Sequence, residues 1–159
     1  MILIASFPGS GNTFLRNILY EVYGIESSTY LIDSNQIHDE NFSEYSFVKT
    51  HLLPHQLPVV AEKATSIYII RDGRDALCSV AHHKKDSVEL DTGFYQNLQK
   101  AIVTDSENFF GGWSSHVIQW VEKADLVLRY EDLISDPQKV LERINTLFPL
   151  PTAHWDRLP

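Results

Sequence analysis

Short apolar runs along the chain are each followed by a polar turn and then by apolar positions at helical spacing. Residues 2–6 form the first run, which ends in a Pro/Gly turn, and residues 13–23 then carry a helical pattern. The same order recurs twice, as a run at 66–70 with a helix at 75–83 and as a run at 125–129 with a helix at 137–147. Each unit therefore predicts a strand, a turn and a helix.

The segments between these units complete the predicted fold. Residues 44–50 read as a further strand and 92–103 and 112–122 as amphipathic helices, whereas 24–44 show too little periodicity to predict an element. Strands that alternate with helices predict an α/β fold, with a mostly parallel sheet covered by helices on both faces. No repeat or linker divides the chain, so residues 1–159 are expected to form a single domain.

Composition limits where a ligand could bind. Of the 159 residues, 43% are hydrophobic, enough for a core, and 13 basic against 21 acidic residues give a net charge of −8. That charge argues against a nucleic-acid partner, so any anion site must be local. Cys78 is the single cysteine, which favours a reducing compartment, and no apolar run approaches the roughly 18 residues of a membrane span. We therefore expect a cytoplasmic protein without a membrane span.

The turn after the first run carries the strongest chemical signal. Its sequence is Ser6-Phe7-Pro8-Gly9-Ser10-Gly11-Asn12-Thr13-Phe14. Free backbone N–H groups in a glycine turn at a helix N-terminus form an anion site, to which the side chains of Ser10, Asn12 and Thr13 can add donors. An ordinary tight turn between strand and helix is the alternative. No Gly-Lys-Ser/Thr sequence follows, so the loop lacks the lysine and magnesium ligand of loops that bind nucleoside triphosphates.

Lys49 and His51 form the second candidate. They are two residues apart on a predicted strand and therefore point the same way, so an ammonium and an imidazole could share one pocket. Histidine is suited to accept a proton near neutral pH, and lysine can stabilise negative charge on a transferred group. A chance surface pairing is the alternative. Pro54 lies between His51 and His55 and argues against a helical metal site, so no metal ligands are predicted.

Arg71 and Ser79 form the third candidate. Arg71 ends a predicted strand, and Ser79 lies eight residues later in the next helix, so both side chains could converge on one phosphate group. The alternative is a local cluster of ion pairs among Arg71, Asp72, Arg74 and Asp75, with Arg74 paired to Asp75.

Taken in order, these segments resemble the family of sulfotransferases that use 3′-phosphoadenosine 5′-phosphosulfate (PAPS). The turn at 7–14 resembles the family's 5′-phosphosulfate loop, and Lys49-Thr50-His51-Leu52 resembles the segment that carries its catalytic histidine. Arg71 with Ser79 resembles its 3′-phosphate site, and residues 128–133 resemble a tyrosine and acid segment near the adenine. The likeness runs from residue 2 to about residue 148 and implies a P-loop-like α/β fold.

The resemblance implies a role for each matching residue. The residues that would bind PAPS are Gly9, Ser10, Gly11, Asn12, Thr13 and Phe14 in the loop, with Arg71, Ser79 and Tyr130. His51 would be the general base that deprotonates an acceptor hydroxyl or amine, and Lys49 beside it would stabilise negative charge. The products would be a sulfated acceptor and adenosine 3′,5′-bisphosphate (PAP), with no metal needed. The expected acceptor is a small molecule or a glycan, and the sequence assigns neither its identity nor the oligomeric state.

Three departures from the family pattern keep alternatives open. Gly9 stands where the family loop commonly has a lysine, Phe14 replaces a common tryptophan, and the family's basic C-terminal segment, which closes over the 3′-phosphate, has no counterpart before residue 159. A catalytically weakened relative that keeps the cofactor site is therefore one alternative. A nucleotide or phosphate-ester kinase would want the missing Gly-Lys-Ser/Thr loop, and a serine hydrolase would want a further glycine before Ser10.

Overall fold

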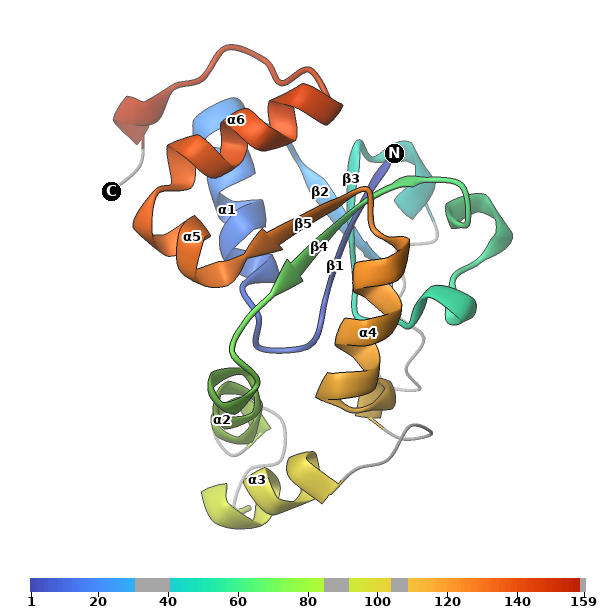
Figure 1. Cartoon of the computed structure of the whole chain (residues 1–159). Coiled ribbons are helices and arrows are strands. Elements are labelled where there is room, and N and C mark those ends of the chain that lie inside the picture. The colour runs from blue at the N-terminus through green and yellow to red at the C-terminus, as the bar shows by residue number, and fades with distance from the viewer. Residues whose placement is uncertain (31–40, 85–91, 104–108, 158–159) are drawn as a thin grey trace.

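Five parallel strands form one sheet in the order β2-β3-β1-β4-β5 (Figure 1). The structure, a computed structural model, describes residues 1–30, 41–84, 92–103 and 109–157. The strands are β1 (Ile2–Ser6), β2 (Ser27–Tyr30), β3 (Phe47–Thr50), β4 (Thr65–Ile70) and β5 (Leu126–Arg129). Every paired register is parallel, so all the carboxyl ends lie along one edge of the sheet.

Helices cover both faces of this sheet. They are α1 (Asn12–Tyr23), α2 (Gly73–His83), α3 (Phe94–Val103), α4 (Trp113–Lys123), α5 (Tyr130–Ser135) and α6 (Pro137–Leu147). Short 3₁₀ turns lie at Phe42–Glu44, Pro54–Gln56, Val59–Ala61, Phe109–Gly111 and Trp155–Arg157. In Figure 1, α1, α5 and α6 lie on one side of the sheet and α4 lies on the other, while α2 and α3 lie beyond the strand ends.

The alternation of side chains along the strands divides the core into two layers. Ile2 and Ile4 of β1 face α1 and α6, where Leu15 and Leu141 are fully buried. Leu3 and Ala5 of β1 face the opposite way and pack in the same layer as Trp120 of α4. Because β1 is central, it is buried on both faces, as its unbroken apolar run predicts.

The predicted α/β class, with a parallel sheet covered on both faces, is confirmed. The strands predicted at 2–6, 66–70 and 125–129 match β1, β4 and β5 to within a residue. β3 begins at Phe47 rather than at residue 44, because Phe42–Glu44 forms a 3₁₀ turn. The sequence did not predict β2 or α5; residues 31–40 of the segment left without an element lie outside the described residues.

Helix starts follow their capping residues. The carboxylate of Asp72 accepts the backbone N–H of Arg74, so α2 begins at Gly73, two residues earlier than predicted. Asp136 caps α6 in the same way, with Pro137 in the first turn as expected. Across the four described ranges, no helix combines the length and apolar character needed to cross a lipid bilayer.

Candidate functional site

The glycine loop lies between the end of β1 and the start of α1, at the carboxyl edge of the sheet. Gly9 and Gly11 have φ values of 77° and 95°, which lie in the left-handed region that favours glycine. A Cβ on Gly9 would lie 2.8 Å from the backbone oxygen of Ala76, and one on Gly11 would overlap the ring of Tyr130. Both glycines are therefore needed for conformation and for close packing against neighbouring elements.

The polar side chains of this loop have different surroundings. Ser10 is buried, and its hydroxyl oxygen has no hydrogen-bond partner within the described chain. Thr13 is exposed in the first turn of α1, and Phe14 is 38% exposed beside it. A buried hydroxyl without a protein partner is the kind of group that a bound ligand satisfies.

Asn12 corrects one sequence expectation. Its amide nitrogen donates to the backbone oxygen of Ile4 at 2.8 Å and lies 3.3 Å from the hydroxyl of Ser6, so the side chain points toward β1. It is 97% buried there, with an exposed fraction of 3%. The side chain of Asn12 therefore ties α1 to the sheet, and only its backbone N–H is left for an anion.

Arg71 extends from the end of β4 to the same loop. Nη1 of Arg71 donates to the backbone oxygen of Gly9 at 2.8 Å, and its guanidinium carbon lies 4.4 Å from the centre of the Tyr130 ring. Nε of Arg71 is buried without a partner among the described residues. Ser79 reaches the loop from α2, because a Cβ on Gly9 would lie 3.2 Å from its hydroxyl oxygen. The structure thus brings Arg71, Ser79 and Tyr130 together around the two loop glycines.

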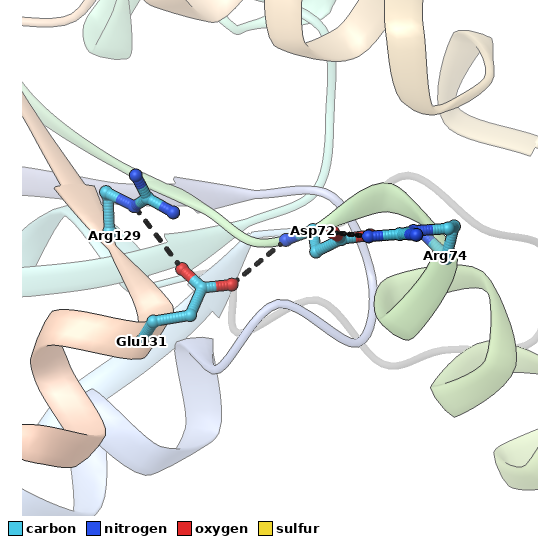
Figure 2. Close-up of polar contacts among 4 residues, drawn as sticks. All are labelled: Asp72, Arg74, Arg129 and Glu131. Carbon is cyan, nitrogen blue, oxygen red and sulfur yellow. Dashed lines mark hydrogen bonds and ion pairs between the residues drawn. The ribbon is translucent and has the colours of Figure 1, made fainter.

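The charged residues beside Arg71 form a separate group on the surface. Figure 2 shows Arg74 paired with Asp72 at 2.6 Å, and Glu131 between Arg129 and the backbone of Asp72. The hydrogen bonds from Arg74 lower the pKa of Asp72 to about 2. Arg74 is hydrogen-bonded to Asp72 at the N-cap, where its backbone N–H, Nε and Nη2 all donate to the carboxylate, and Asp75 acts on it only through its charge. Among the described residues, Arg71 instead contacts Gly9 and Tyr130.

His51 follows β3 at the same edge of the sheet. Its Nδ1 lies 2.6 Å from the backbone oxygen of Ser6, which can only accept, so Nδ1 carries the proton and Nε2 keeps its lone pair. Burial lowers the pKa of His51 to about 3, with the charge of Lys49 adding to the shift and the Ser6 carbonyl opposing it. The ring is therefore neutral at pH 7.

Lys49 lies next to a second cation, Arg16 of α1. Arg16 donates to the hydroxyls of Ser27 and Thr29 on β2, at 2.6 and 3.2 Å, and Thr29 is paired with Lys49 in the sheet register. Burial, and then the charge of Arg16, lowers the pKa of Lys49. Arg16 also lines a groove of about 410 Å³ with Thr13 and Ser27. The groove is lined by one cationic and one acidic side chain, Arg16 and Glu26.

Three further buried residues surround the His51 segment. His116 and Trp120, one turn apart on α4, lie within hydrogen-bond distance of the backbone oxygens of His51 and Leu52, at 3.0 and 2.9 Å. Tyr68 of β4 lies 3.0 Å from the other ring nitrogen of His116. A spacing of four residues on α4 is also typical of core packing, so the sequence did not mark His116 as part of a site.

Comparison with known families decides the wider assignment. Residues 35–153 match the family described as the sulfotransferase domain. The chain belongs to the sulfotransferase family. The predicted family resemblance is confirmed, and the parallel sheet has the P-loop-like arrangement of that family.

Similar sequences extend the likeness to the glycine loop, which precedes the matched residues. Cytosolic sulfotransferase 1 of Danio rerio is 27% identical over 184 residues and covers 98% of this chain. Sulfotransferase 1A1 of Bos taurus is 28% identical over 181 residues and covers 96%. This chain spans 61% of the length of each, about three fifths of these relatives.

Solved structures show the same fold at lower identity. Mouse sulfotransferase SULT7A1, in complex with PAP, matches with a TM-score of 0.73 and 23% identity, over 98% of this chain and 61% of its own. A sulfotransferase from Alicyclobacillus acidocaldarius matches with a TM-score of 0.58 and 12% identity, over 91% of this chain and 78% of its own. At these identities the likeness concerns the fold.

Proposed function

We propose that this protein is a PAPS-dependent sulfotransferase that transfers a sulfuryl group to a hydroxyl or amine of a small molecule or glycan. The observation that carries the proposal is the meeting of Arg71, Ser79 and Tyr130 around Gly9 and Gly11. Family membership and the PAP complex of the mouse relative support the same assignment. The name of the cytosolic relative and the single Cys78 support a cytoplasmic location as part of the proposal.

The residues around the loop fit the nucleotide in their chemistry. The Ser10 hydroxyl and Nε of Arg71 are buried donors without a partner in the described part of the chain, and the glycine turn leaves no room for side chains. Ser10 and the backbone N–H groups of Gly11, Asn12 and Thr13 would bind the 5′-phosphosulfate. Arg71 and Ser79 would bind the 3′-phosphate, and Phe14 and Tyr130 would contact the adenine.

His51 would act as the general base through Nε2. The lone pair on Nε2 is available at neutral pH because Nδ1 donates to Ser6. A histidine with a pKa of about 3 is a weak base, but the negative charge of a bound phosphosulfate would raise that value, and the acceptor proton would become more acidic as its atom bonds to sulfur. As the acceptor oxygen or nitrogen bonds to sulfur, its proton would pass to Nε2 and the bond from sulfur to the phosphate oxygen would break.

Fixed cations and backbone donors would stabilise the charge that develops in transfer, without a metal. Lys49 is close enough to His51 to lower its pKa, so its ammonium is near the reacting groups. Arg16 adds a second positive charge beside Lys49. These two side chains would supply part of the electrostatic stabilisation that a lysine at position 9 would otherwise provide.

A PAP-binding relative that has lost catalysis is the second candidate, and Gly9 in place of the family lysine favours it. The packing of Gly9 against Ala76 and Ser79 favours the active enzyme instead, because the loop is built around a glycine. The neighbours of Gly9 therefore fit a glycine at this position, as expected if the loop is functional.

A transfer assay tests the proposal directly. The protein is incubated with PAPS labelled in its sulfuryl group and a panel of four acceptors: a phenol, an aliphatic alcohol, a glycan and an amine. We expect label in at least one acceptor, stoichiometric formation of PAP, and loss of both with His51→Ala. Binding of PAP without transfer to any acceptor class would favour the inactive relative, and absence of PAP binding would reject both.

A further inference from the structure

His51 belongs to a closed ring of hydrogen bonds that joins the ends of β1 and β3 to β4 and α4. The phenol oxygen of Tyr68 lies 3.0 Å from Nδ1 of His116, and Nε2 of His116 lies 3.0 Å from the backbone oxygen of His51. Nδ1 of His51 lies 2.6 Å from the backbone oxygen of Ser6. The ring closes at the next residue, because the backbone N–H of Phe7 donates to the oxygen of Tyr68.

Backbone groups set the direction of every bond in this ring. The His51 carbonyl only accepts, so a neutral His116 carries its proton on Nε2, donates to that carbonyl, and keeps Nδ1 as an acceptor. The O–H of Tyr68 therefore donates to Nδ1 of His116, while its oxygen accepts from the backbone N–H of Phe7. Since the Ser6 carbonyl only accepts, His51 must donate from Nδ1. The peptide between Ser6 and Phe7 therefore begins and ends the ring.

The ring lies in the core rather than at a wet surface. Tyr68 and His116 are both fully buried, and the indole of Trp120 stacks on Tyr68 with ring centres 6.0 Å apart. The edge of Phe7 packs against the His116 ring at 5.7 Å. Apolar side chains of similar volume commonly stabilise such positions as well as a buried polar pair does. A polar pair that is fully hydrogen-bonded here therefore points to a role in fixing geometry.

We propose that His116 and Tyr68 are positioning residues for His51. His116 holds the backbone of His51 against α4, and Tyr68 fixes the His116 tautomer that can donate to it. With the backbone held, the imidazole stays within reach of the Ser6 carbonyl, and Nε2 keeps its lone pair. This inference rests on the proposed function, in which His51 is the general base.

Three variants and one control separate positioning from simple packing. His116→Leu removes both hydrogen bonds at similar volume, His116→Gln restores a donor near the place of Nε2, and Tyr68→Phe removes a single oxygen. His55→Gln is the matched control, because His55 also contacts α4, through Gln119, but is exposed. Circular dichroism checks that each variant folds, and Tyr68→Phe keeps the test informative if His116→Leu does not.

Two measurements are made on the folded variants. Turnover and PAP affinity are compared, and ¹⁵N spectra of the histidine side chains report which ring nitrogen of His51 carries the proton. We expect turnover of His116→Leu to fall about 10- to 100-fold, as with outer partners of other functional histidines, with PAP affinity unchanged. Turnover of Tyr68→Phe should fall less than that of His116→Leu. His116→Gln should recover most of the lost turnover, and His55→Gln should match the wild type. His51 should show one tautomer in the wild type and a mixture in His116→Leu.

Different results would contradict the positioning role of His116 and Tyr68 and the proposed sulfotransferase function. Unchanged turnover and a single His51 tautomer in both His116→Leu and Tyr68→Phe would overturn the positioning role. Equal loss of PAP affinity and turnover, without recovery in His116→Gln, would also overturn it and indicate packing. If the wild type neither binds PAP nor transfers label, the proposed function fails. The tautomer of His51 in the variants then still decides the positioning role.

Discussion

The glycine loop and the His51 segment meet at the same edge of the sheet but are held there by different physical means. The loop is held by shape, since Gly9 packs against Ala76 and Gly11 packs against Tyr130 with no space for a Cβ. The His51 segment is held by hydrogen bonds with buried groups: His116 donates to its backbone, and the Ser6 carbonyl accepts from its ring. The binding side of the site should therefore be sensitive to added volume, and the catalytic side to the loss of single polar atoms.

The largest effect is expected for His51→Ala, on the side held by hydrogen bonds. Turnover should fall by roughly 10² to 10⁴, the usual contribution of a general base, while PAP affinity stays near the wild-type value. Turnover and calorimetric binding are measured on the same preparations, with His55→Ala as the exposed control. A parallel fall in turnover and affinity would make His51 a structural residue and remove the contrast between the two sides.

Gly9→Lys should damage the side held by shape. The new Cβ would meet the Ala76 carbonyl, and φ would stay near 77°, so we expect a loss of about 2 kcal/mol or more in the free energy of unfolding, with lower turnover. Gly24→Lys is the matched control, because Gly24 also has a positive φ, 66°, but nothing lies within 4 Å of its Cβ position. Denaturant unfolding and turnover at saturating PAPS check both variants. Faster turnover in Gly9→Lys would favour the weakened relative.

Arg71→Ala should remove the preference for PAP over AMP without changing the geometry around His51. A charge-assisted hydrogen bond contributes roughly 1.5 to 3 kcal/mol, so PAP affinity should fall more than tenfold while AMP affinity changes little. Arg74→Ala is the control, since Arg74 lies three residues away with a side chain 90% exposed and pairs with Asp72. Calorimetry with both nucleotides gives the ratio. Similar losses in both variants would indicate a general charge effect rather than recognition of the 3′-phosphate.

The smallest effect is a dependence of stability on pH that comes from the buried histidines. Burial lowers the pKa of His116 to about 4, below the 6.5 of an unfolded histidine, so below pH 6.5 the unfolded state takes up a proton that the folded state does not. Stability should therefore fall as the pH is lowered, by about 1.6 kcal/mol between pH 6.5 and pH 5 for this residue alone. Denaturant unfolding at the two pH values measures it. The fall should be smaller in His116→Gln and unchanged in His55→Gln, and equal slopes in all three proteins would contradict the account.

Local patterns in the sequence predicted most of the fold and the loop. The apolar runs that became β1 and β4 are buried on both faces, and the glycines at 9 and 11 mark a turn that only glycine can form. β2 was missed because Ser27–Tyr30 is a short, polar strand at the edge of the sheet, with little periodicity. Asn12 was misjudged because its side-chain direction depends on a contact with Ile4, which lies beneath the turn.

The groups that hold His51 could not be predicted in the same way. His116 lies 65 residues after His51, and its hydrogen bond exists only because α4 packs over the ends of β3 and β4. The cation beside Lys49 likewise depends on the pairing of β2 with β3, which places Thr29 between Arg16 and Lys49. Long-range packing, rather than local pattern, determines this half of the site.

The central claim is that the loop side of the site recognises a nucleotide with phosphates on both its 3′ and 5′ positions. Calorimetric titration of the wild-type protein with PAP and with AMP tests it most directly, since the two ligands differ only in the phosphate assigned to Arg71 and Ser79. We expect PAP to bind more than tenfold more tightly than AMP. Equal affinities for the two nucleotides, or no binding of PAP, would contradict the account.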